Sequence, residues 1–352
     1  MIPKNTRDRV EKLKKTIEKY RHEYHVLNKS DISPEALDSL KHELSKLEEE
    51  YPELVTPDSP TQRVAGEPLK EFKKVVHKVP QWSFNDAFDE GEINDFDKRV
   101  KNFLVKAGIS PDKVEYTCEL KIDGLKIVYE YENGLLKTAA TRGNGQVGED
   151  VTLNVRTIES VPLKLKHPAN VIVEGEVYLR KSQFERINRE LSKSGEVTYA
   201  NPRNVAAGTI RQLDPKIVAE RKLSTFIYDL ASVSKTPLRG NGLQGASLTL
   251  PTNQFEELKY LRDLGFAVNP HYQLAKNISD CRENDFQFNS HRPLDYQGTS
   301  IHYARRLQPQ SYYGNSGGIA EPVTWPERLF PYRHSKAARF FVRGEFNLHP
   351  WR

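Results

Sequence analysis

A lysine placed between two carboxylates is the feature of this 352-residue sequence whose residue types and spacing could carry out chemistry. Glu119, Lys121 and Asp123 alternate within CELKIDGL, so on a β-strand they would share one face. Burial lowers the pKa of a lysine ammonium, and the neutral amine is a nucleophile. The row fits a reactive cleft, but it also fits the solvated face of an edge strand, with Lys121 as an ordinary surface lysine.

A glycine-rich segment, TRGNGQVGEDVT, follows in the sequence. Its three glycines have the G-x-G-x-x-G spacing of a dinucleotide-binding loop: Gly143, Gly145 and Gly148. We reject this interpretation because Glu149 and Asp150 would place negative charge where a pyrophosphate meets a helix N-terminus, and no acidic residue follows at about twenty positions. A hydride-transferring dehydrogenase, which rests on that spacing, is therefore the least supported function. The glycines instead predict tight turns that bring Arg142 to the mouth of a cleft.

Two further segments combine charged residues with small ones. Glu174 and Glu176 flank a glycine in the strand-like NVIVEGEVYL. A glycine inside a strand indicates close approach of another backbone or a ligand, although an exposed acidic strand face is the alternative. In ANPRNVAAGTIRQLD, Arg203 and Arg211 accompany small residues, which suits phosphate binding. The alternative there is a helix capped by Asn201 that carries two surface arginines.

The first part of the chain shows helical periodicity. Apolar residues at spacings of three or four predict a first helix: Val10, Leu13, Ile17, Tyr20 and Tyr24. Ser33 followed by Pro34 is typical of the start of a second helix, and helical spacing continues until Pro52. Residues 1–50 are therefore predicted to form a helical hairpin.

The middle of the chain mixes strands with helices. Alternating β-branched and aromatic residues predict strands at 114–131, 170–179 and 221–233. Asn133 and Gly134 predict a turn, and a helix is expected from about Lys181. Because the elements do not follow a regular βαβ alternation, they predict an α+β fold, with a helical hairpin domain and a second domain built on antiparallel sheets.

Composition limits the classes of function. A formal charge of +5 permits a nucleic-acid partner without requiring one. No apolar run reaches the roughly 18 residues that a membrane span needs, so we predict no membrane association and a cytoplasmic location. Cys118 and Cys281 are too few for a disulfide framework or a four-cysteine zinc site. Residues 281–352 hold nine arginines but one lysine and show no period, so they predict a loosely ordered tail or one of different origin.

Taken together, these segments resemble the adenylation region of the bacterial NAD-dependent DNA ligases. The family's motifs occur in order: PELVTPDSPTQRV, CELKIDGL, ATRGNGQVGEDVTLNVRTI, EGEVYL and ANPRNVAAGTIRQLDP. The resemblance implies that residues 1–70 form a helical domain that binds the nicotinamide mononucleotide half of NAD. It also implies that residues 71–280 form an adenylation, or nucleotidyltransferase, domain, with 281–352 as an atypical tail.

The resemblance implies a role for each matching residue. Lys121 would attack the α-phosphorus of NAD and hold AMP, which then passes to the 5′-phosphate of a nick in double-stranded DNA, while Asp123 would assist the later steps and the metal. Arg203 and Arg211 would face phosphates of the cofactor or the nick. The residues that would contact NAD are Tyr24, His25, Asp38, Glu119, Arg142 and Glu176. In-line phosphoryl chemistry also implies Mg²⁺, with ligands left open, and we expect a monomer.

The sequence departs from the family in two places. Pro34 and Leu37 stand where the family has an acid and a tyrosine, which should weaken NAD capture. No lysine occurs from 277 to 335, where the family's second D-G-x-x-x-K motif and a further lysine are expected. A truncated or frame-shifted ligase gene would explain this. The alternative function is therefore a catalytically impaired ligase remnant that only binds nucleotide or DNA, unable to seal nicks and very slow in self-adenylation.

Overall fold

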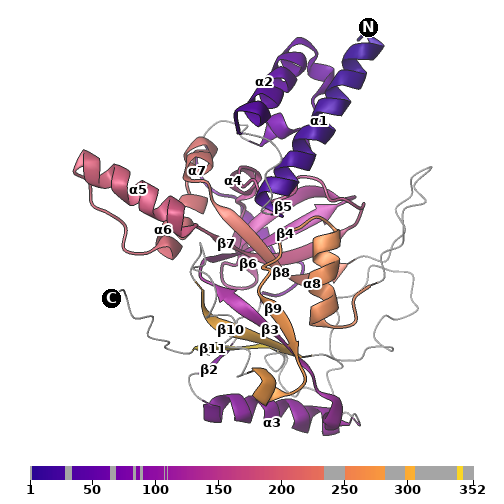
Figure 1. Cartoon of the computed structure of the whole chain (residues 1–352), viewed down its shortest axis with the longest axis vertical. Helices are drawn as coiled ribbons and strands as arrows, with labels where there is room; N and C mark the ends of the chain where they lie inside the picture. The colour runs from indigo at the N-terminus through magenta and orange to yellow at the C-terminus, as the bar shows by residue number, and fades with distance from the viewer. Residues whose placement is uncertain are drawn as a thin grey trace.

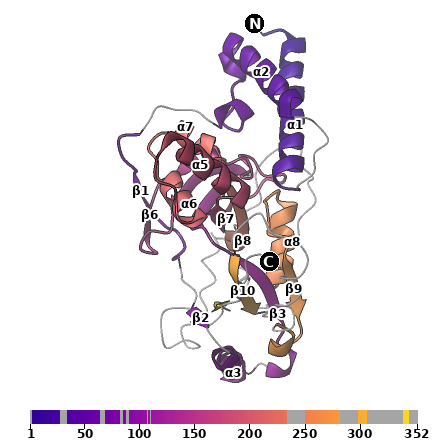
Figure 2. The same ribbon diagram turned by 60° about the vertical axis from the view of Figure 1, so that its left-hand side comes forward.

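The described part of the protein contains two larger sheets with their helices, a two-stranded ribbon and a helical hairpin. The computed structural model describes residues 2–27, 34–63, 69–81, 85–87, 90–106, 108, 110–233, 250–281, 298–305 and 339–343. Figures 1 and 2 both show the hairpin at one end of the molecule and helix α3 at the other, with the sheets between them. Mixed helices and antiparallel strands confirm the predicted α+β class. No helix in these ranges has the length and apolar character of a membrane span.

The hairpin consists of α1 (Lys4–His25) and α2 (Pro34–Glu50), as predicted. Its core is a cluster of buried apolar residues at helical spacing: Val10, Leu13, Ile17, Leu37 and Leu44. α2 begins at Pro34, while the expected cap, Ser33, lies outside the described residues. Two single-turn 3-10 helices, η1 (Pro52–Leu54) and η2 (Pro60–Gln62), follow the hairpin.

The central sheet has the strand order β5-β4-β7-β8, all antiparallel. Its strands are β4 (Leu125–Glu132), β5 (Leu135–Thr141), β7 (Val171–Tyr178) and β8 (Ser224–Val233). The helices that share apolar contacts with it are α4 (Thr152–Arg156), α5 (Lys181–Ser194), α6 (Pro202–Ile210), α7 (Pro215–Arg221) and α8 (Gln254–Asp263). Ile127, Tyr129 and Val173 of this sheet are buried in the main core. Because side chains alternate along a strand, Lys126, Glu174 and Glu176 lie on the opposite face.

A second sheet contains the strand that carries Lys121. In the described residues its order is β2-β11-β10-β3-β9, and all pairs are antiparallel except β2 with β11. The strands are β2 (Asn85–Ala87), β3 (Tyr116–Ile122), β9 (Tyr272–Ala275), β10 (Gly298–Arg305) and β11 (Arg339–Arg343). Helix α3 (Glu90–Lys106) packs on it through Phe96 and Val100, and η3 (Pro111–Lys113) leads into β3. A two-stranded ribbon of β1 (Lys74–Val76) and β6 (Val147–Glu149) completes the fold.

Two sequence predictions about strands need correction. The single strand predicted over 114–131 is two strands, β3 and β4, which belong to different sheets and are separated at Asp123 and Gly124. The strand predicted from Arg221 begins at Ser224, because α7 extends to Arg221. In the tail, where the sequence shows no period, β10 and β11 pair in the sheet of β3.

The turn predicted between β4 and β5 is confirmed. Asn133 and Gly134 form a two-residue loop with φ values of 52° and 79°. Positive φ at both central positions is the requirement of a type I′ hairpin turn, which explains why the chain uses Asn-Gly there.

Leu37→Tyr is expected to lower the free energy of unfolding by about 1–3 kcal/mol, because a larger side chain must enter a filled hairpin core. Leu37→Met, which is nearly equal in volume, is the matched control and should cost less than about 1.5 kcal/mol. Urea denaturation followed by circular dichroism measures both. A Leu37→Tyr protein as stable as wild type would show that the ring leaves the core for solvent.

Candidate functional site

The Lys-x-Asp-Gly segment is the point where the chain leaves one sheet and enters the other. Lys121 lies near the end of β3, and β4 starts directly after Gly124. A Cβ atom on Gly124 would lie 2.1 Å from the backbone oxygen of Val177, so only glycine allows β4 to pass this close to β7. The glycine therefore brings the end of β3 close to the strand that carries Glu176.

A small cavity between the two sheets joins several of the predicted site residues. Its volume is about 30 Å³, and its lining residues are Glu119, Leu120, Lys121, Ile122, Glu176, Phe226, Tyr228 and Asn269. The structure thus brings Glu119, Lys121 and Glu176 together. This space is much smaller than the roughly 300–1,000 Å³ of a typical ligand pocket, so it can form only part of a nucleotide site.

Three of the lining residues were not predicted from the sequence to belong to the site. Phe226 and Tyr228 are two positions apart on β8, and Asn269 donates its side-chain amide to the carbonyl of Leu120 at 3.2 Å. The period-two aromatic pair was a usable signal, because both rings must share one face of a strand that pairs with β7. Nothing in the sequence around Asn269 indicates its position.

The carboxyl of Glu176 has a strongly altered proton affinity. Burial raises its pKa to about 7, although the positive charges of Lys121, Arg203 and Lys126 act in the opposite direction. Titratable groups with altered pKa values collect at functional sites, so this carboxyl marks the cavity as the candidate site.

A buried ion pair lies next to Glu176. Lys126 Nζ is 2.6 Å from Glu174 Oε2, and the two side chains are only 12% and 6% exposed. Lys126 is also the cross-strand neighbour of Glu176. Glu174 is thus buried and paired, not part of the exposed acidic strand face that the sequence also allowed, and its partner Lys126 was not among the predicted site residues.

Asp123 faces the first turn of α6. Arg203 Nη1 lies 3.2 Å from Asp123 Oδ1, and about half of the Arg203 side chain is exposed. The cap predicted for this helix is confirmed, because Asn201 Oδ1 accepts a hydrogen bond from Asn204 N at 2.8 Å. A helix capped by Asn201 and a functional position for Arg203 are therefore compatible. The capped start of α6 holds Arg203 beside Asp123, the predicted catalytic residue.

Arg142 lies at the tight turn predicted from the glycines. Gly143 and Gly145 have φ values of 54° and 94°, and Gly145 N donates to Arg142 O at 3.0 Å. The segment then enters β6, which pairs with β1, so these glycines do not open a helix. Arg142 Nε is buried without a hydrogen-bond partner in the described residues, which leaves a donor for a ligand. Arg142 does not line the cavity of Lys121.

The guanidinium of Arg211 is paired with the carboxylate of Glu149. Its Nε and Nη2 donate to the two carboxylate oxygens of Glu149 at 2.8 and 3.1 Å. The bidentate contact lowers the pKa of Glu149. A phosphate would have to compete with Glu149 for this guanidinium.

The three predicted residues of the hairpin lie apart from the cavity of Lys121. Tyr24 is about half exposed and packs edge-on against His25, with ring centroids 4.8 Å apart. Burial lowers the pKa of His25 to about 4, opposed by the charge of Glu159. Asp38 is exposed on α2. These positions fit a separate binding surface at the end of the hairpin nearest the central sheet.

Comparison with known proteins identifies the family. Residues 69–299 match the NAD-dependent DNA ligase adenylation domain, and residues 3–65 match the DNA ligase-like, N-terminal NAD+-binding domain. The chain therefore belongs to the NAD-dependent DNA ligase family.

Among curated relatives, the DNA ligase of Thermotoga neapolitana is 45% identical over 296 residues, covering 84% of this chain and 40% of that protein. The DNA ligase of Carboxydothermus hydrogenoformans is 45% identical over 273 residues, covering 77% and 38%. This chain thus spans about two fifths of their length. A solved structure, mycobacterial DNA ligase D complexed with ATP and MES, gives a TM-score of 0.28 at 13% identity, covering 65% of this chain and 54% of that one.

Glu176→Gln is expected to stabilise the protein at pH 8 and to lose this advantage as the pH falls toward 5. The folded protein raises the pKa of Glu176 from 4.5 to about 7, so the folded state binds the extra proton between these values and stability declines as pH rises through them. Thermal melting at both pH values measures the effect, with the exposed Glu53→Gln as control. An equal difference from wild type at pH 5 and pH 8 would contradict the altered pKa.

Proposed function

We propose that this chain carries out the adenylation step of an NAD-dependent DNA ligase. The neutral Lys121 amine attacks the α-phosphorus of NAD, forming an N–P bond. The bond from that phosphorus to the bridging oxygen breaks, and nicotinamide mononucleotide leaves with the electron pair while the amine proton passes to solvent. The observation that carries this proposal is the position of Lys121 beside Glu119 and Glu176 in one cavity of a chain from this family.

The other site residues bind and orient the substrate in this proposal. Glu119 and Glu176 accept hydrogen bonds from adenine and ribose, and Asp123, held by Arg203, faces the reacting phosphate. Arg142 offers Nε, which has no hydrogen-bond partner within the described residues. On the hairpin, the mononucleotide half of NAD contacts Tyr24, His25 and Asp38. Arg211 meets a phosphate only when it leaves Glu149.

We also propose that Mg²⁺ binds between a carboxylate of the protein and the phosphate oxygens of the substrate. The described residues include no group of three His, Cys, Asp or Glu side chains that could hold a metal, so a cage made of protein ligands alone is not present among them. Mg²⁺ commonly uses one or two carboxylates together with waters and phosphate oxygens. Asp123, half-buried beside the cavity, fits such a site, where the ion would neutralise phosphate charge.

The remaining steps concern DNA. We propose nicked double-stranded DNA as the partner that receives AMP on its 5′-phosphate, with a monomeric protein acting in the cytoplasm, where NAD and DNA occur together. The alternative of an impaired remnant is favoured by one observation, the absence of lysine from 277 to 335. Fewer positive groups around the phosphate would slow the step, since each preorganised donor contributes roughly 10² to 10³ in rate.

Lys121→Arg is expected to abolish the AMP adduct that forms when the protein is incubated with NAD and Mg²⁺. A guanidinium stays protonated and offers no lone pair to phosphorus. Intact-mass spectrometry detects the adduct, and Lys98→Arg, at an exposed lysine on α3, is the matched control that should keep it. An adduct that persists in Lys121→Arg would place the nucleophile elsewhere, whereas a wild-type protein that binds NAD without any adduct would support the remnant.

A further inference from the structure

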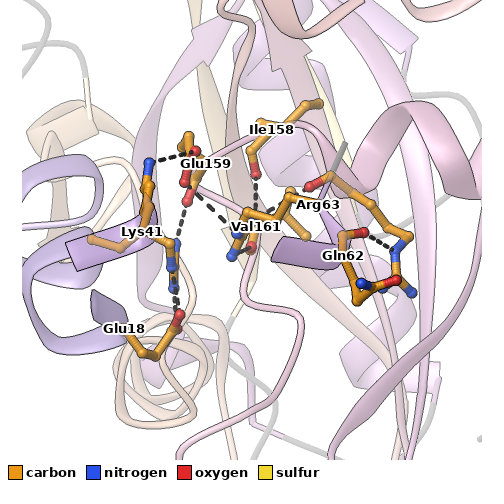
Figure 3. Close-up of polar contacts among 9 residues, drawn as sticks. Glu18, Lys41, Gln62, Arg63, Ile158, Glu159 and Val161 are labelled. Atoms are coloured by element: carbon orange, nitrogen blue, oxygen red, sulfur yellow. Dashed lines mark hydrogen bonds and ion pairs between the residues drawn. The ribbon is translucent and has the colours of Figure 1, made fainter. Parts of the chain in front are cut away.

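Glu159 is the point where three segments of the N-terminal region meet the central domain, by which we mean the central sheet with the helices and loops packed on it. It follows α4, and Figure 3 shows its surroundings. Arg21 of α1 donates Nη1 to the backbone oxygen of Glu159. Lys41 Nζ of α2 lies 3.6 Å from Glu159 Oε1, and Arg63 Nε, after η2, lies 3.7 Å from Glu159 Oε2. One residue of the central domain therefore contacts both helices of the hairpin and the connector that follows them.

The connector is fixed on the same loop by backbone hydrogen bonds. The Arg63 side chain is 5% exposed, and its guanidinium donates to the carbonyls of Arg156 and Ile158 at 3.2 Å and of Val161 at 3.0 Å. In return, Arg156 Nε donates to the carbonyl of Gln62 at 3.3 Å. Figure 3 shows these reciprocal bonds across the junction. The carbonyls accept from Nη1 and Nη2 only, whereas Arg63 Nε has no hydrogen-bond partner in the described residues, and the positive charge still requires an anion.

The Glu159 carboxylate supplies that anion. Burial lowers the pKa of Arg63 to about 10, and the charge of Arg21 acts in the same direction. Burial by itself raises the pKa of Glu159, but Arg63 and Lys41 outweigh it and keep the pKa below its usual value. The second carboxylate in the cluster, Glu18, accepts from Arg21 Nε at 2.8 Å. Removal of the Glu159 charge would leave two nearly buried guanidinium groups with one acid, an unfavourable arrangement.

The cluster is adjacent to the residues proposed to hold the mononucleotide. Arg21 and His25 are four positions apart on α1 and so lie on one face of the helix. The charge of Glu159 acts on His25 as well as on Arg21. Tyr24 packs on the His25 ring. Arg21 thus holds the end of α1 at the backbone oxygen of Glu159, and the Glu159 carboxylate acts on this end of the helix through its charge.

We propose that Glu159 is a positioning residue for NAD: it holds the last turn of α1 against the central domain, so that one NAD molecule reaches both the Tyr24–His25 pair and Lys121. This proposal rests on the proposed function. When the docked arrangement is only partly populated, the apparent affinity for a ligand that needs it falls in the same proportion. Glu159 does not touch the reacting atoms, so its loss should weaken binding of NAD rather than the chemical step.

Calorimetric titration with NAD in a Lys121→Arg background tests the proposal without interference from adduct formation. Glu159→Gln is expected to raise the Kd for NAD at least about tenfold, because it removes the charge while keeping the side-chain shape. Glu159→Asp, which keeps the charge, should stay within about threefold of the parent. Glu132→Gln, at an exposed acid of the central sheet paired with Lys137, is the matched control and should change nothing. An unchanged Kd in Glu159→Gln would overturn the proposal.

Hydrogen exchange measures docking independently of NAD. Amides at 18–25 and 157–163 are expected to exchange faster in Glu159→Gln and in Arg21→Met, and the two changes together should add little beyond either one, since they break one junction. Unchanged exchange in both variants would also overturn the proposal.

If the Lys121→Arg parent binds NAD but the wild-type protein forms no adduct, the proposed adenylation activity is wrong. The comparison of Kd values still decides the role of Glu159 in that case. If the parent binds no NAD, both the proposed function and the positioning role are wrong.

Discussion

The close approach of β4 to β7 at Gly124 is the constraint on which the rest of the site depends. With no side chain there, β4 passes directly beside the Val177 carbonyl, and the chain can leave the sheet of β3 and enter the central sheet within two residues. This crossing places Lys121 and Lys126 on different sheets yet near the same carboxyl, Glu176. Lys121 and Glu119 therefore line a cavity instead of an exposed strand face, whereas Asp123 lies beyond the end of β3 and pairs with Arg203.

Charged side chains cluster around Lys121 and around Glu159, and the pKa of the central carboxyl is shifted in opposite directions in the two clusters. Around Lys121, burial dominates, and the raised pKa of Glu176 shows that nearby cations do not fully offset it. Around Glu159, cations dominate, and the pKa of the acid stays low. The first arrangement leaves a carboxyl ready to exchange a proton or a hydrogen bond with a ligand. The second pairs opposite charges where the hairpin and the connector contact the central sheet's helices and loops, although Arg63 Nε and Glu159 Oε2 make no hydrogen bond in the described residues.

The arginines predicted to bind phosphates differ in availability for the same electrostatic reason. Arg142 has an unpartnered nitrogen in the described residues, whereas Arg203 and Arg211 are paired with Asp123 and Glu149. Both of the paired arginines are more than half exposed, and exposed ion pairs are weak enough for a phosphate to displace the carboxylate. At Arg203 and Arg211, a phosphate would therefore have to take the place of the carboxylate, whereas at Arg142 it would meet a nitrogen that has no hydrogen-bond partner in the described residues.

Local chemistry let the sequence by itself determine the helical hairpin, the Asn133–Gly134 turn, the Asn201 cap and the candidate nucleophile, because each depends on residues close together in the chain. Only the tertiary structure decided that 114–131 is two strands, since the break at Gly124 is imposed by a carbonyl more than fifty residues away. The same holds for Lys126, Asn269 and the Glu159 junction. Their partners come from distant segments, and the energy of a buried charge depends on which groups the fold places around it.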